Sequence, residues 1–212
     1  MIVALAGPPA LVLVGNWWFG ERPPLGAAIA LQIVYCAIGG FIVWTVLRKE
    51  RLPLASIGLH APRWSTIFVA ALLWLVALQL LPILTVPLRD AGATAAPDSL
   101  RRLIALPVWF RVVVALTGGV VEEVLYRGYA IERLTTMTGN QWRAAAIATI
   151  AFAMAHIPAW GIRYALIAHL PFGVIATLCY LWRRDLLANI LAHDVGLLVG
   201  VLSVRTSLSV AV

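Results

Sequence analysis

Residues 107–131 read PVWFRVVVALTGGVVEEVLYRGYAI, an apolar run that is long enough to cross a bilayer and yet carries two adjacent glutamates. A helix needs roughly 20 predominantly apolar residues to span the hydrocarbon of a membrane. One charge at the centre of such a helix costs about 2.5–3.5 kcal/mol. The pair Glu122 and Glu123 therefore indicates that neighbouring helices supply polar partners or a polar cavity.

The rest of the chain is equally apolar. Its 212 residues are 62% hydrophobic and 12% charged, with a mean hydropathy of +0.94, whereas soluble domains are about half apolar and a quarter charged. Six further apolar runs are typical of membrane-spanning helices: Ile2–Phe19, Leu25–Leu47, Ser65–Leu88, Ala144–His156, Tyr164–Trp182 and Leu186–Val204. The sequence predicts an all-α polytopic transmembrane helix bundle of six to eight spans, with residues 1–212 in a single domain. Pro8-Pro9 are expected to break the first run.

Basic residues sit mainly in the short connections between these runs and give a net charge of +7. In a membrane protein they indicate topology and contact with the lipid bilayer, not nucleic acid. The connection Arg48–Arg63 is expected to be cytoplasmic by the positive-inside rule, and Glu132–Arg143 and Arg183-Arg184 fall on the same side. The stretch Arg89–Arg111 falls on the opposite side although it holds four arginines.

The two glutamates differ in the partners that their own helix offers. Glu123 and Arg127 are four residues apart, with the acid on the N-terminal side, so they are predicted to pair. Glu122 points about 100° away from Glu123 around the helix and has no cation at that spacing. A carboxylate that no cation holds is available as a general base. The alternative is that both acids pair with arginines of other helices.

Two histidines also lie in apolar runs. His156 follows Phe152 by four residues near the end of a short span, and His193 is flanked on both sides by apolar helix. Asp194, the neighbour of His193, is a further candidate that points elsewhere on the helix, where an arginine could pair with it. His169 is expected to be a packing histidine, with a role in lining a cavity as the alternative.

Together, Glu122, His156 and His193 come from three separate apolar helices that could converge on one polar cavity. There the glutamate and one histidine can share a water that attacks a carbonyl, and the second histidine can donate to the oxyanion. Zinc also binds two histidines and a glutamate, but no His-Glu-x-x-His helix is present, and Arg127 would lie near the ion. We therefore expect no metal or other cofactor. A proton relay in a transporter is a further alternative.

Three segments resemble the motifs of one known family. Glu122-Glu123-x-x-x-Arg127-Gly128, Phe152-x-x-x-His156 and His193 are similar to the motifs of the CPBP family, the CAAX proteases and bacteriocin-processing enzymes of the Rce1/Abi type, over roughly residues 107–204. The resemblance implies an integral protein of the cytoplasmic membrane of a prokaryote that hydrolyses a membrane-associated peptide or protein without metal. It makes Glu122 the general base, lets His156 hold the water and His193 face the oxyanion, and gives supporting roles to Glu123, Arg127 and Phe152.

The sequence departs from the family pattern at Leu197. The family usually has Asn or Asp four residues after the last histidine, where this chain has leucine, which cannot donate to an oxyanion. One lost oxyanion donor costs on the order of 100- to 1000-fold in rate, and Asp194 is a poor substitute by direction. The alternative is therefore a non-catalytic membrane protein of the same fold, for bacteriocin immunity or partner binding. Neither the substrate nor the oligomeric state is indicated.

Overall fold

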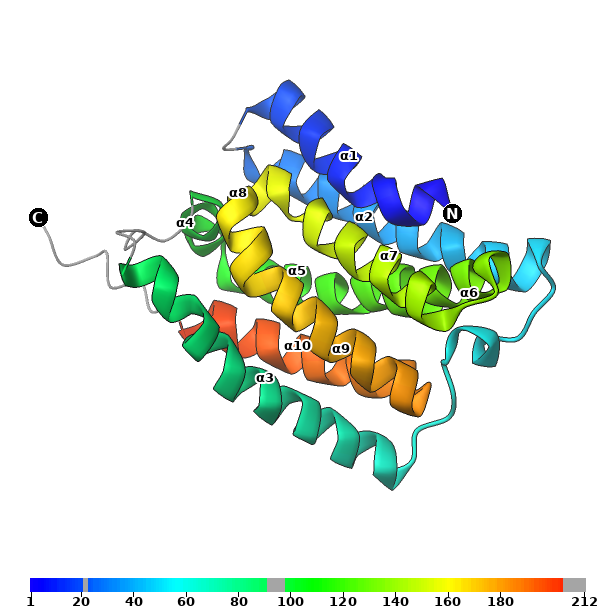
Figure 1. Cartoon of the computed structure of the whole chain (residues 1–212). Coiled ribbons are helices and arrows are strands. Elements are labelled where there is room, and N and C mark those ends of the chain that lie inside the picture. Colours follow the sequence, from blue (N-terminus) through cyan, green and yellow to red (C-terminus); the bar gives the residue numbers. More distant parts are fainter. Residues whose placement is uncertain (21–22, 91–97, 204–212) are drawn as a thin grey trace, which may run out of the picture.

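A computed structural model describes residues 1–20, 23–90 and 98–203, and within these residues every element is a helix (Figure 1). The elements are α1 (Ile2–Phe19), α2 (Leu25–Trp44), η1 (Thr45–Lys49), η2 (Leu54–Ile57), α3 (Trp64–Asp90), α4 (Asp98–Ala105), α5 (Val108–Glu122), η3 (Glu123–Ile131), α6 (Glu132–Thr138), α7 (Gln141–Ala155), α8 (Ile157–Tyr164), η4 (Ala165–His169), α9 (Leu170–Arg183) and α10 (Leu186–Ser203). The predicted all-α fold is confirmed.

The protein is a polytopic helical membrane bundle, as its apolar runs predicted. In the described part of the chain, three helical runs are long and apolar enough to cross a bilayer, namely Ile2–Phe19, Leu25–Lys49 and Ile157–Arg183. Trp64–Leu80 and Leu186–Leu202 are apolar but shorter. The range of six to eight spans stays a prediction.

The predicted break at Pro8-Pro9 is wrong, because α1 continues through both prolines. Proline removes one backbone donor and crowds the preceding turn, but membrane helices tolerate it where neighbouring helices pack against the affected turn. Here Pro8 is buried, and α1 lies along α2 and α7. Packing therefore outweighs the local preference.

The centre of the bundle is the continuous run of α5, η3 and α6. In Figure 1, α1 and α2 lie above α5, α10 and α3 lie below it, and α7 and α9 pass in front. All residues of η3 are buried. η3 is π-helical, a widened form of the helix that often occurs at functional sites. The two glutamates mark its start, since α5 ends at Glu122 and η3 begins at Glu123.

The connections predicted to share one side of the membrane do lie together at one end of the bundle. Arg133 pairs with Glu50 at 2.6 Å, and Arg184 pairs with Glu132. Glu132 follows Glu122 by ten residues, or on the order of 15 Å along a helix. A bilayer's hydrocarbon is about 30 Å thick, so Glu122 lies near its middle if this charged layer marks the membrane surface.

Arg111 ends the stretch Arg89–Arg111 but also falls in the predicted run 107–131, and the structure places it inside α5. Its side chain is buried, and its Nη1 donates to the carbonyl oxygen of Val201 near the end of α10, at 3.3 Å. The last carbonyls of a helix carry partial negative charge, which stabilises the buried guanidinium. Arg111 therefore holds α5 to α10 instead of marking a loop.

Candidate active site

Glu123 and Arg127 form the predicted pair, and both side chains are fully enclosed. Nη1 of Arg127 donates to Oε1 of Glu123 at 2.8 Å, and the two side chains are 1% and 0% exposed. Nδ2 of Asn189 donates to Oε2 of Glu123 at 3.2 Å. The guanidinium of Arg127 lies 4.1 Å from the ring centre of Phe152 and donates to the carbonyl of Gly173 at 3.4 Å. These contacts lock Glu123 in place.

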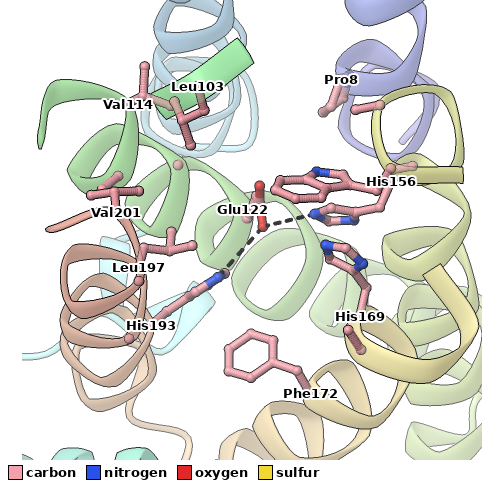
Figure 2. A pocket seen from close by; sticks show the side chains of 18 of the residues that line it. Pro8, Leu103, Val114, Glu122, His156, His169, Phe172, His193, Leu197 and Val201 are labelled. Atoms are coloured by element: carbon pink, nitrogen blue, oxygen red, sulfur yellow. Dashed lines mark ion pairs between the residues drawn. The ribbon is translucent and has the colours of Figure 1, made fainter. Parts of the chain in front are cut away.

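Glu122 faces a different environment, with no arginine partner among the described residues. Its Oε2 lies 3.7 Å from Nε2 of His156 and 3.8 Å from Nε2 of His193 (Figure 2). Its Oε1 accepts a hydrogen bond from the hydroxyl of Tyr35 at 3.3 Å. The structure thus brings together Glu122, His156 and His193 from α5, the end of α7 and α10, in the arrangement that the sequence indicated.

The contacts of the two histidines fix which ring nitrogen faces Glu122. Nδ1 of His156 lies 2.7 Å from the carbonyl oxygen of Phe152, and Nδ1 of His193 lies 3.0 Å from Oε1 of Glu123. Both partners can only accept, so each Nδ1 carries hydrogen and donates it. Both Nε2 atoms therefore face Oε2 of Glu122, and in the neutral rings both are acceptors.

Glu122 and the histidines open onto a cavity of about 820 Å³. Its wall is mostly apolar and draws on both halves of the chain, with Leu11 and Gly15 of α1 and Leu73 and Ala77 of α3 among its residues. Gln32 and Tyr35 add polar groups from α2, one turn apart. The cavity thus combines apolar walls with a few convergent polar groups, which is typical of a ligand site.

His169 lies in the cavity wall, which is the alternative role, and its ring also packs against a neighbouring histidine. Its ring stacks on His156 with centres 4.0 Å apart and planes at 26° (Figure 2). Its Nδ1 contacts the carbonyl oxygen of Tyr164 at 3.1 Å. Gly161 has a φ of 78°, which interrupts α8 and redirects the chain ahead of His169. This bend has no clear sequence signal beyond the glycine itself.

Sequence reasoning also missed two residues that contact the glutamates. Asn189 lies four residues before His193, so the shared helix face was a usable signal for its contact with Glu123. Tyr35 gave no such signal, because it is one tyrosine in a long apolar run of another helix. Only the three-dimensional structure brings it to Glu122.

Asp194 and Leu197 follow His193 on α10 but contribute differently. Asp194 packs against α5, where a Cβ on Gly119 would overlap its carboxylate. Oδ1 of Asp194 is buried without a hydrogen-bond partner, and no arginine contact of Asp194 is found among the described residues. Leu197 lies in the cavity wall beside His193 (Figure 2). An apolar side chain thus stands where the family pattern expects Asn or Asp.

The fold and the site define a helical membrane protein with a glutamate and two histidines around an internal cavity. Residues 104–206 match the family described as type II CAAX prenyl endopeptidase Rce1-like. The match includes Glu122, His156 and His193. The match covers slightly less than half of the chain and, over this part, confirms the resemblance seen in the sequence. No curated protein and no solved structure gave a significant match.

Among the described residues, no group of three or more His, Cys, Asp or Glu is placed to hold a metal ion.

Proposed function

We propose that the protein is an intramembrane endopeptidase that hydrolyses a membrane-associated peptide or protein with a water activated by Glu122. The observation that carries the proposal is the approach of His156 and His193 to the same oxygen of Glu122, at 3.7 and 3.8 Å. A water between Oε2 of Glu122 and Nε2 of His156 can donate one hydrogen to each, because both atoms accept.

In the proposed reaction, the water oxygen attacks the substrate carbonyl carbon and its proton passes to Glu122. The carbonyl electrons move to the oxygen, and the resulting oxyanion accepts a hydrogen bond from Nε2 of His193, whose ring is protonated in this step. When the carbon–nitrogen bond breaks, Glu122 returns the proton to the leaving amine. The products are a carboxylic acid and an amine, Glu122 is ionised again, and neither a covalent intermediate nor a metal ion takes part.

The charges around the site are consistent with these roles. Glu122, Glu123 and Arg127 together carry one negative charge when all three are ionised. One added proton, on Glu122 or on an imidazole, makes the buried cluster neutral. Nδ1 of His193 already contacts the Glu123 carboxylate, so a proton on Nε2 of His193 would have its charge balanced and could be donated to the oxyanion.

The test uses purified protein in liposomes with two quenched-fluorescence probes, a farnesylated peptide ending in a CAAX sequence and an unprenylated apolar leader peptide. The wild type is expected to cleave at least one probe, with and without a chelator. Glu122→Gln should reduce cleavage to background and keep the thermal unfolding midpoint. Equal cleavage by this variant would exclude the mechanism.

A second candidate is a non-catalytic membrane protein of the same fold that binds a partner or confers bacteriocin immunity. The observation that favours it is the Leu197 side chain in the cavity wall beside His193. It predicts that protection of cells from a bacteriocin, or partner binding, survives Glu122→Gln. Loss of protection in that variant would favour the peptidase.

A further inference from the structure

The Tyr35 hydroxyl differs from the two imidazole nitrogens near Glu122, because it can donate a hydrogen bond to the carboxylate. The Nδ1 atoms of His156 and His193 are used by Phe152 and Glu123, so both Nε2 atoms reach Glu122 as acceptors in the neutral rings. The Tyr35 hydroxyl can donate whatever the protonation of the rings, and it lies 3.3 Å from Oε1 of Glu122.

The two oxygens of Glu122 are thereby divided between two sides of the cavity. Oε1 faces Tyr35 on α2, and Oε2 faces the two imidazoles. A carboxylate can turn about its last side-chain bond, because that torsion is broad and roughly two-fold. A fixed donor on one oxygen limits this rotation, so the other oxygen keeps its direction toward the imidazoles.

We propose that Tyr35 is a positioning residue for the hydrolysis, holding Oε1 of Glu122 so that Oε2 is the oxygen that takes the proton of the water. This inference rests on the proposed peptidase function. Tyr35 lies outside the family-matched residues 104–206, so the first half of the chain would contribute to the chemistry as well as to the cavity wall.

The decisive variant is Tyr35→Phe, which keeps the ring and removes the hydroxyl. A hydrogen bond to a charged group corresponds to a loss of about 10- to 100-fold when it is removed. We expect kcat for the probe peptide to fall by about that factor and KM to stay within roughly twofold, because the hydroxyl acts on Glu122 and not on the bound peptide.

Tyr126 on η3 offers a matched control. Its hydroxyl is also buried, but it has no hydrogen-bond partner among the described residues. Tyr126→Phe makes the same chemical change and should leave kcat at the wild-type value. A loss in Tyr35→Phe without a loss in Tyr126→Phe assigns the effect to the contact with Glu122. Equal losses in both would overturn the positioning role.

A measurement that needs no substrate keeps this inference separate from the peptidase proposal. Infrared difference spectra of the protein in liposomes contain the carboxyl band of Glu122, identified by its loss in Glu122→Gln. Tyr35→Phe should shift that band, and if this variant fails to fold, 3-fluorotyrosine at position 35 should shift it.

An unchanged band, or wild-type kcat in Tyr35→Phe, overturns the positioning role and leaves the peptidase proposal intact. Cleavage that persists in Glu122→Gln removes the peptidase proposal, and with it the positioning role, even if the band shows the contact.

Discussion

His193 lies between the two glutamates, with its Nδ1 3.0 Å from Oε1 of Glu123 and its Nε2 3.8 Å from Oε2 of Glu122. The enclosed acid therefore orients the imidazole, and the imidazole faces the acid that opens onto the cavity. Two neighbouring residues of one helix thus take different parts. Glu123 is fixed by three donors, whereas Glu122 remains accessible to a ligand.

Arg127→Met should destabilise the protein strongly. It leaves the Glu123 carboxylate buried without its cation, and breaking a buried ion pair in this way costs about 3–5 kcal/mol. Chemical unfolding in detergent micelles measures the loss. The double variant Arg127→Met with Glu123→Leu removes both charges and should recover part of it. A single variant as stable as the wild type would show that the pair does not hold the bundle together.

Leu197→Asn should raise peptidase activity. Asparagine at this position would place a donor one turn beyond His193 in the cavity wall, and one oxyanion donor is worth on the order of 100- to 1000-fold in rate. The rise should appear in kcat for the probe peptide.

Leu197→Met is the matched control for that gain, because it keeps the side chain apolar at similar volume and should leave kcat unchanged. If neither variant cleaves any probe while both remain folded, the non-catalytic alternative gains support.

The fold was largely predictable from the sequence, because long apolar runs admit few structures in a membrane. The Glu123–Arg127 contact was also predictable, since it depends on spacing within one helix. The contact of Tyr35 with Glu122 was not, because it depends on how α2 packs against α5. The same holds for His169, which stacks on His156 only after the bend at Gly161.

His169→Ala should lower kcat, whereas His169→Phe should retain most of it. The His169 ring supports His156 by stacking at 4.0 Å, and an aromatic pair of this kind is worth about 0.5–1.5 kcal/mol. Loss of the ring therefore corresponds to roughly a 2- to 13-fold effect. Steady-state cleavage of the probe peptide compares the two variants. Equal losses in both would indicate that His169 acts through its nitrogen atoms and not by stacking.

Glu50→Gln should lower stability at neutral pH by about 1 kcal/mol, the upper range for a partly exposed pair. Burial alone would raise the pKa of Glu50, but the Arg133 guanidinium and the Tyr129 hydroxyl hold that pKa below its ordinary value of 4.5. Because the folded-state pKa is lowered, the contribution is fully present above pH 4.5 and disappears as the pH falls through the folded-state pKa.

Unfolding of wild type and Glu50→Gln at a series of pH values checks this. The two curves should separate at neutral pH and converge in acid. In an Arg133→Gln background, Glu50→Gln should cost much less. A difference between wild type and Glu50→Gln that is constant over the whole pH range would contradict the ion-pair explanation.

The most direct test of the account is a single turnover of the probe peptide in water labelled with oxygen-18, followed by mass spectrometry of product and protein. Water activated by Glu122 should place the label in the new carboxylate of the product and leave the protein fragment that contains Glu122 unlabelled. Label in the Glu122 carboxylate would instead indicate a covalent intermediate and would contradict the proposed role of that residue.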